Sequence, residues 1–333
     1  MESEVADTET ARRYEQFARD EAPGRSELYG EFAAGVARDE DLLTRIDQLP
    51  IVKRQPNLLF AAVRAVTGLA ASYDDFRQRF FSRTDQVLDI MRRRATQTNE
   101  CARTAAILPV LGELDGPIAL IEVGASAGLC LNPDKYRMTY RDVEGAALQS
   151  VGPEGSPVRL DCTVEGRPPL PKRMPNVVWR AGLDLNPLDV TDPDDVAWLQ
   201  ALVWPEQTER AERLKAAIEV ARAEPPDLRR GDLTRDLNAL LAEVPDGVLP
   251  VVFHTAVLAY VPDEERQKFV DERMSQKAVW ISQEGQSVMP LPGGPTAYDS
   301  GKDRSRFLLA VNGEPIGLTE PHGGYLRWFA HTL

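Results

Sequence analysis

The sequence predicts an α/β protein in which an all-helical N-terminal domain, residues 1–114, precedes a domain built on a parallel sheet, residues 115–333. Two patterns lead to this prediction. Up to Leu114, apolar residues recur at intervals of three and four, the spacing that places them on one face of a helix. From Gly116 onward, short apolar runs alternate with helical stretches, which is typical of parallel strands in a sheet covered on both faces.

The helical domain is predicted from apolar stripes and from the prolines that separate them. The first two stripes are Tyr14, Phe17, Ala18 and Leu28, Phe32, Val36, and further helices are expected at Asn57–Ala71, Tyr73–Ala95 and Asn99–Val110. Pro23, Pro50 and Pro56 mark breaks, because proline cannot donate the hydrogen bond that a helix interior requires.

The sheet domain begins with a short apolar run, Pro117–Val123, bounded by turn-forming residues, which indicates a strand buried on both faces. Similar runs follow at Val177–Leu183, Asp227–Asp232, Leu249–His254 and Ala278–Gln283, with helical stretches at Asp194–Val203, Glu206–Ala223 and Asp263–Ser275. The final runs are Arg306–Asn312, Pro315–Thr319 and Tyr325–Phe329. Because only short turns separate these last three, we expect them to return antiparallel at one edge of the sheet.

One stretch, residues 133–175, interrupts this alternation where a single helix would be expected. It is rich in Gly and Pro, and Tyr136–Tyr140 and Pro157–Val164 alternate like strands. We interpret it as an inserted β-hairpin that covers the functional site, while a plain surface excursion fits the same pattern. Pro133 also ends early any helix that starts after Gly128.

Composition favours a globular protein and disfavours nucleic acid as its partner. Apolar residues make up 43% of the chain and charged residues 27%, both near the averages for folded domains. The formal net charge of −13 disfavours nucleic acid as a partner, since phosphate contacts depend on Lys and Arg. Cys101, Cys130 and Cys162 form no C-x-x-C pair, so we expect reduced thiols and no metal site.

The sequence also predicts a cytoplasmic location without a membrane partner. The longest apolar run, Val248–Val261, is too short to span a bilayer. The acidic N-terminus lacks the basic and apolar regions of a secretion signal. No feature of the sequence indicates the oligomeric state.

The candidate functional loop runs from Glu122 to Gly128, directly after the first predicted strand. Glycines lack a Cβ and accept positive φ, so Gly124 and Gly128 allow the backbone to approach a ligand closely. At the start of a following helix, free N–H groups would offer hydrogen bonds to a polar or anionic group. The position after a buried strand, more than the glycines themselves, indicates a binding loop.

This heptad resembles the first motif of Rossmann-like methyltransferases, in which an acidic residue precedes a G-x-S-x-G or G-x-G-x-G loop close to S-adenosylmethionine. The resemblance implies a methyltransferase-type sheet, S-adenosylmethionine as cofactor and methyl transfer to a small molecule. It assigns cofactor binding to the loop and to the ends of the second and third strands, where acids contact the ribose and the adenine. These residues are Glu122, Gly124, Ala125, Ser126, Gly128, Asp184, Asn186, Asp232 and Leu233.

The whole chain also resembles the uncharacterised prokaryotic family DUF2332, which brings no established activity. The segments that carry this resemblance begin at Gln55, Thr98, Glu122, Asp184, Trp204 and His254. Within them, we interpret six residues as candidate contacts to a substrate: Gln55, Asn57, Asn99, Glu100, His254 and Tyr260. Helix capping explains Asn57 and Asn99 as well, and packing explains Tyr260.

Other functions fit the same loop. Gly124 to Gly128 also matches the elbow of serine hydrolases, with Ser126 as nucleophile and Asp232 and His254 or His322 as its partners. The helical N-terminal domain favours the cofactor loop, because a hydrolase elbow normally follows several strands. A nucleoside-binding module without turnover, or glycines that serve only a tight turn, are the remaining alternatives.

Single residues at the strand ends have ordinary alternative roles. His254 is the candidate base for a methyl acceptor, or a buried, hydrogen-bonded histidine of the core. Asp184 and Asp232 either contact the ligand or cap a turn or helix. Glu122 either lies near the ligand or accepts N–H groups of its own loop, and we assign His322 to a turn.

Overall fold

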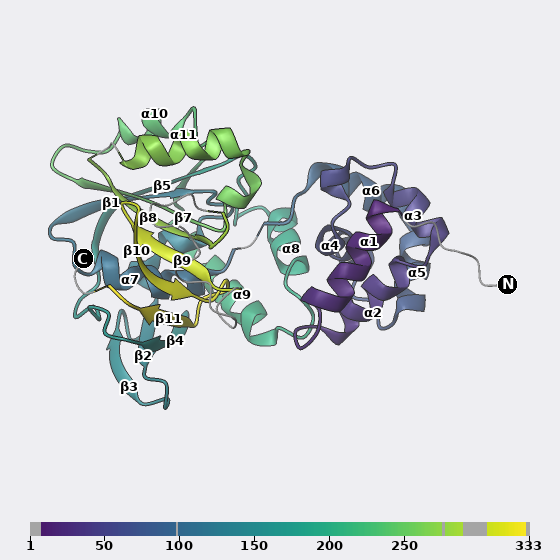
Figure 1. The fold of residues 1–333 in the computed structure, drawn as a ribbon, viewed down its shortest axis with the longest axis horizontal. Helices are drawn as coiled ribbons and strands as arrows, with labels where there is room; N and C mark the ends of the chain where they lie inside the picture. The colour runs from purple at the N-terminus through teal and green to yellow at the C-terminus, as the bar shows by residue number, and fades with distance from the viewer. Residues whose placement is uncertain (1–7, 98, 275–276, 289–304, 331–333) are drawn as a thin grey trace. The chain divides into compact units, whose positions relative to one another are not determined.

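The computed structural model describes residues 8–97, 99–274, 277–288 and 305–330. The described residues form two compact units, one from Met1–Thr98 with Thr191–Glu212 and one from Asn99–Val190 with Arg213–Leu333. The first unit is helical, and the second contains the described sheet (Figure 1). The α/β class and the order of helices before sheet are therefore confirmed.

Most helices of the first unit begin at a side-chain cap, and the helices surround an aromatic core. Its elements are α1 Glu9–Gln16, the π-helical turn η1 Phe17–Glu21, α2 Glu27–Val36, α3 Glu40–Ile46, the 3-10 turn η2 Ile51–Lys53, α4 Pro56–Thr67, α5 Tyr73–Ser82, α6 Thr84–Arg93 and α8 Pro193–Ala201. α9 Thr208–Ala223 begins in this unit and ends in the second. Phe60 has ring contacts with Tyr14, Phe17, Tyr29, Phe32 and Phe76.

One helix that periodicity groups with the N-terminal helices belongs to the sheet unit instead. It is α7 Thr104–Leu111, preceded by the 3-10 turn η3 Cys101–Arg103. Every residue of α7 is buried, and the carbonyl oxygen of Ala105 accepts a hydrogen bond from the Tyr140 hydroxyl at 2.8 Å. An almost entirely apolar helix has no polar face for solvent, so it packs inside the larger core.

The second unit is built on one sheet of eleven strands. They are β1 Pro117–Val123, β2 Arg137–Arg141, β3 Ala147–Val151, β4 Arg159–Glu165, β5 Asn176–Asp184, β6 Asp227–Arg230, β7 Leu249–Thr255, β8 Val279–Gly285, β9 Phe307–Val311, β10 Glu314–Thr319 and β11 Tyr325–Trp328. Their order in the sheet is β3-β2-β4-β11-β10-β9-β8-β7-β1-β5-β6. Each apolar run predicted as a strand outside the insertion forms one.

Five neighbouring strands at one end of the sheet are parallel and follow the order of a doubly wound fold. The spatial order β6-β5-β1-β7-β8 is 3-2-1-4-5 in chain order. α10 Leu237–Leu241 and α11 Asp263–Met274 pack on one face of these strands (Figure 1). The chain changes direction along the sheet between β1 and β7, and ligands of such sheets bind beyond the carboxyl ends of the strands at this point.

The inserted stretch, residues 133–175, lengthens the sheet. β2 and β3 form an antiparallel hairpin, and β4 pairs parallel with both β2 and β11. The antiparallel strands β9 and β10 are present, but the sheet continues beyond them, because β11 offers a free edge that β4 pairs with. β3 forms the edge opposite β6, so the strand order gives no support to a hairpin covering the loop after β1.

Candidate functional site

The loop after β1 does not lead into an α-helix. The 3-10 turn η4 Leu129–Leu131 follows it, and a second short turn, η5 Pro133–Lys135, comes next. Proline lacks the N–H that a continuing helix would need. The expected helix N-terminus is therefore wrong for residues 122–135, all of which are described, and no helix dipole faces a ligand at this loop.

The first and last N–H groups of the loop are bonded to backbone oxygens. Gly124 and Ala125 both donate to the carbonyl oxygen of Leu183, at 2.7 and 3.1 Å, which continues the pairing of β1 with β5. Gly128 donates to the carbonyl oxygen of Ala125 at 2.7 Å. These three N–H groups stabilise the turn and are not offered to a ligand.

Two side chains accept the remaining N–H groups of the loop. The Ser126 N–H donates to Oδ2 of Asp184 at 2.8 Å, and the Ala127 N–H donates to Oδ1 of Asn99 at 3.1 Å. Nδ2 of Asn99 also donates to Oγ of Ser126. Asn99 thus bonds the loop through both ends of its side-chain amide and does not cap a helix. Every N–H of residues 124–128 therefore has a partner within the protein.

Neighbouring side chains fill the space that the loop glycines leave. A Cβ on Gly124, whose φ is +71°, would lie 2.3 Å from Cγ2 of Val257. A Cβ on Gly128, whose φ is +70°, would lie 2.8 Å from Cγ of Pro226. The glycines allow a close approach, as predicted, but the group that approaches is the protein itself.

The end of β5, beside this loop, is more open. Oδ1 of Asp184 accepts the Asn186 N–H at 2.7 Å, while its other oxygen accepts the loop N–H described above. Leu185, between these two predicted site residues, is 69% exposed. A carboxylate beside an exposed apolar side chain is suited to contact a ribose and the face of a base.

The end of β6 is organised by local hydrogen bonds. Oδ1 of Asp232 accepts the N–H and the hydroxyl of Thr234, at 2.8 and 2.5 Å. The hydrogen bond from the hydroxyl is the main cause that lowers the pKa of Asp232, and the bond from the N–H acts in the same direction. Leu233 packs partly buried against the core under α10 and α11. This geometry agrees with the turn-forming alternative for Asp232, and its contact with a ligand stays a prediction.

Glu122 is buried beneath the loop, with 4% of its surface exposed, and its Oε2 has no hydrogen-bond partner in the part of the chain that the structure describes. Burial raises the pKa of Glu122 well above its usual range, against the opposing effect of the positive charge of Arg103. Arg103 is also buried and donates to the carbonyl and hydroxyl oxygens of Thr255 at 3.1 and 3.2 Å. Glu122 accepts none of the loop N–H groups, contrary to its structural alternative.

Glu100 has a structural ion pair. Its carboxylate is bonded at both oxygens by Arg213, at 2.8 and 3.1 Å, and Oε1 also accepts the Ala102 N–H at 3.1 Å. The side chain is 2% exposed. In this conformation Glu100 holds η3 against α9 and does not face solvent.

His254 is a buried member of the core, with no exposed surface. Nε1 of Trp280 donates to Nε2 of His254 at 3.0 Å, so Nε2 is an acceptor and the ring proton is on Nδ1, which donates to Oε1 of Glu284 at 2.6 Å. Both ring nitrogens are therefore occupied. In register, His254 pairs with Val123, which places it on the opposite face of the sheet from Glu122. The geometry supports the core alternative over a base for a methyl acceptor.

The remaining substrate candidates lie in different surroundings. Gln55 and Asn57 are at the start of α4 in the first unit, where Gln55 bonds the Val52 carbonyl oxygen and the Thr96 hydroxyl. Tyr260 follows β7 in the 3-10 turn η6 Leu258–Tyr260 of the second unit and is 73% exposed. Its exposure contradicts a packing role and leaves it accessible to a ligand.

The hydrolase alternative requires a hydrogen bond between Ser126 and a histidine. Among the described residues, the hydroxyl of Ser126 is bonded by Asn99 and not by a histidine. His254 is bonded to Glu284 and Trp280, and His322 lies in the turn before β11, as predicted. The φ of +50° at Ser126 is a strained value of the kind found at functional sites, but without a base the hydroxyl is not activated.

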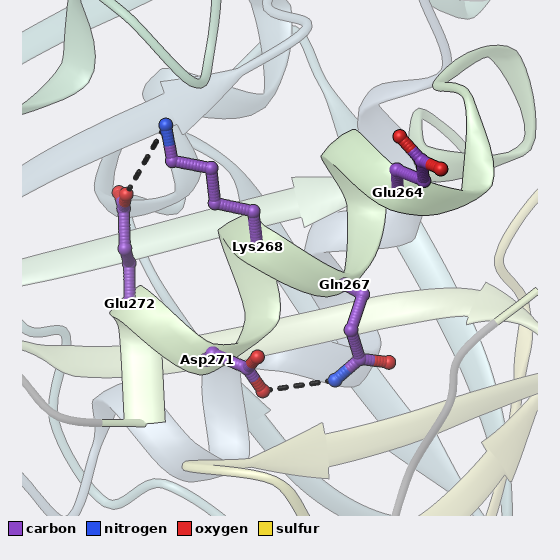
Figure 2. Close-up of a pocket in the computed structure, with 5 residues that line it drawn as sticks. All are labelled: Glu264, Gln267, Lys268, Asp271 and Glu272. Atoms are coloured by element: carbon purple, nitrogen blue, oxygen red, sulfur yellow. Dashed lines mark hydrogen bonds and ion pairs between the residues drawn. The ribbon is translucent and has the colours of Figure 1, made fainter.

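A hollow on the protein surface lies along α11 and not at a strand end. It is lined by five side chains of that one helix, Glu264, Gln267, Lys268, Asp271 and Glu272 (Figure 2). Two contacts join them, Gln267 to Asp271 at 2.8 Å and Lys268 to Glu272 at 4.0 Å. Pairs four residues apart on an exposed helix are ordinary surface interactions, and this hollow has no catalytic constellation.

Four residues that shape the site were not identified from the sequence: Arg103, Leu185, Val257 and Glu284. Two of them carry a signal, because a charged residue within or directly after a predicted buried segment indicates a buried polar contact. Arg103 precedes α7, and Glu284 lies in the buried strand β8. The other two depend on packing between segments distant in sequence, which periodicity does not report.

A family model described as "Uncharacterized protein conserved in bacteria (DUF2332)" matches residues 11–328, and the chain belongs to this family. No curated protein matches the chain, and no solved structure does. Within the part of the chain that the structure describes, no group of three or more His, Cys, Asp or Glu side chains is placed to hold a metal ion. No helix among the described residues has both the length and the apolar character needed to cross a membrane.

Proposed function

We propose, for a chain whose family is described as uncharacterised, that the second unit binds the nucleoside part of a small-molecule cofactor at the carboxyl ends of β5, β1 and β6. We take S-adenosylmethionine as the cofactor and methyl transfer to a small molecule as the reaction. The ribose would contact Asp184, and the adenine would lie against Leu185 near Asp232.

The observation that carries the proposal is the open end of β5 in a doubly wound sheet. The strand order 3-2-1-4-5 makes the carboxyl edge beside β1 the ligand edge of such folds. At that edge Asp184 ends the second strand in the order, and Leu185 exposes 69% of its surface next to it. The proposal assigns this exposed side chain, beside the carboxylate of Asp184, to contact with the base of the nucleoside.

The glycine loop does not fit the cofactor in the conformation described. Each N–H group of residues 124–128 has a protein partner, and Val257 occupies the space over Gly124. The proposal therefore assigns binding to the side chains at the ends of β5 and β6 and derives no chemical step from the loop. The serine hydrolase is not proposed, because no histidine among the described residues bonds the hydroxyl of Ser126.

The proposal is tested by titrating the protein with S-adenosylhomocysteine in a calorimeter. Leu185→Ser removes the exposed apolar contact, and we expect affinity to fall about tenfold, the effect of about 1.4 kcal/mol of lost apolar burial. Val178→Ser is the matched control, because Val178 lies on β5, the strand that Leu185 follows, and is 53% exposed. Both variants should keep the wild-type free energy of unfolding within about 0.5 kcal/mol.

Absence of any heat of binding by the wild type, or an equal loss in both variants, would reject a nucleoside site at this edge. Binding that Leu185→Ser weakens and Val178→Ser does not would support it. Incubation of the protein with methyl-labelled cofactor and a small-molecule extract then asks whether label is transferred.

A further inference from the structure

The segment after β7 closes the glycine loop. Val257 lies against Gly124 so closely that one added carbon would be 2.3 Å from its methyl group. Gly124 and Val257 follow the neighbouring parallel strands β1 and β7, on the two sides of the switch point. Val257 thus lies where a cofactor would approach the bare backbone of Gly124.

A buried carboxylate holds Val257 in this place. Oε1 of Glu284 accepts the N–H groups of Val257 and Leu258, at 2.9 and 3.3 Å, and the Nδ1–H of His254 at 2.6 Å. Trp280 in turn fixes the ring of His254. Glu284 is fully buried, so these hydrogen bonds act in a medium where charge-assisted bonds are strong.

The same segment has the features of an element with a second position. Ala256 has φ +57°, which an alanine adopts only under constraint from its surroundings. Val257 is partly exposed, and Ala259 and Tyr260 beyond it are exposed. Arg266 of α11 ties the far end of the segment by donating to the carbonyl oxygens of Leu258 and Val261, at 3.1 and 3.0 Å, whereas the Val257 N–H is held by Glu284.

We infer that residues 255–261 form a gate over the glycine loop, with Val257 as the closing side chain and Glu284 as the residue that positions it. This inference rests on the proposed function, since the gate controls access of a nucleoside cofactor to the edge between β1 and β7. Opening moves Val257 away from Gly124, and binding selects the open state.

Two measurements on the full chain test the gate. Hydrogen exchange of residues 255–261, measured without any ligand, reports how firmly Glu284 holds this segment. We expect Glu284→Gln to speed exchange of the Val257 and Leu258 N–H groups about tenfold. Ser282→Ala is the matched control on the same strand, because its buried hydroxyl has no hydrogen-bond partner among the described residues. Calorimetry with S-adenosylhomocysteine reports access, and Val257→Ala should bind about tenfold tighter than the wild type.

Each outcome decides one point. Faster exchange in Glu284→Gln, together with tighter binding by Val257→Ala, supports the gate. Unchanged exchange in Glu284→Gln overturns the positioning role of Glu284, whatever the ligand does. If the wild type binds and Val257→Ala binds equally or more weakly, the gate is wrong and the proposed function stands. If neither the wild type nor Val257→Ala binds, the proposed function fails, and with it the gate.

Discussion

The ends of β1 and β5 are neighbours in one parallel sheet, yet the first is closed and the second is open. After β1, Ala125, Ser126 and Ala127 are at most 4% exposed, and the backbone N–H groups around them are bonded within the protein. After β5, Leu185 is 69% exposed. The recognisable motif therefore lies in the closed end, while the residue most accessible to a ligand lies outside the motif. A loop sequence shows where backbone and ligand can meet, but not which group fills that place.

The largest effect expected from this difference is at Gly124. Gly124→Ala adds a Cβ at positive φ and against Val257, which should lower the free energy of unfolding by about 2–4 kcal/mol, from strain and overpacking together. Gly116→Ala is the control, because Gly116 has φ +80° and open space around it, so only the conformational cost of about 1 kcal/mol applies. Urea denaturation measures both.

Combined with Gly124→Ala, Val257→Ala should restore part of the lost free energy of unfolding, because the added Cβ of residue 124 meets Val257. Combined with Gly116→Ala it should restore none, because nothing in the described part of the chain lies near that position. If Gly124→Ala is no worse than Gly116→Ala, the end of β1 is open in solution, and the contrast between the two strand ends disappears.

The next effect is at Asn99, which bonds the closed loop. Asn99→Ala leaves the fully buried Ala127 N–H without its acceptor, at a cost of about 1–3 kcal/mol in the free energy of unfolding. Asn186→Ala, at the open end, should cost less than about 0.5 kcal/mol, because its side chain is paired with the exposed Arg230. Equal losses in the two variants, measured by denaturation, would show that both ends are equally packed.

The sequence predicted the elements around both ends because their signals are local. The run Pro117–Val123 is apolar throughout and bounded by turn formers, and β1 has these bounds. The strand β5 and the end residue Asp184 were found in the same way. The parallel direction of these strands also follows from local signals, since strands that alternate with helices favour parallel crossovers, whereas their order in the sheet does not.

The contacts that close the loop after β1 were not predictable from local signals. Glu284 reaches His254 and Val257 across about thirty residues, and Asn99 reaches Ala127 across a similar distance. Such contacts depend on how strands and turns pack in three dimensions, and no periodicity records them. The sequence did contain the break at Pro133, which explains why no helix follows the loop, but a resemblance to a motif favoured the helix.

The most gradual effect is a pH dependence that separates Glu122, beneath the closed end of β1, from Asp232, which follows β6 beside the open end of β5. Burial raises the pKa of Glu122 above its ordinary value of 4.5. At a pH between 4.5 and the raised pKa, the folded protein therefore binds more protons than the unfolded chain. The free energy of unfolding then falls as pH rises, by at most about 1.4 kcal/mol per pH unit. Glu122→Gln has no such proton, so its stability relative to the wild type should grow from pH 5 upward.

Asp232 contributes a pH dependence of the free energy of unfolding with the opposite sign. The hydrogen bonds from Thr234 lower the pKa of Asp232, so its contribution is present at neutral pH and is lost as pH falls below about 4, through the folded pKa. Asp232→Asn should therefore converge on the wild type in acid, whereas Glu122→Gln diverges from it toward neutral pH. Urea midpoints from pH 3 to pH 8 compare the three proteins. Parallel curves for the wild type and Glu122→Gln would mean that the carboxyl of Glu122 is solvated, and that the end of β1 is as open as the end of β5.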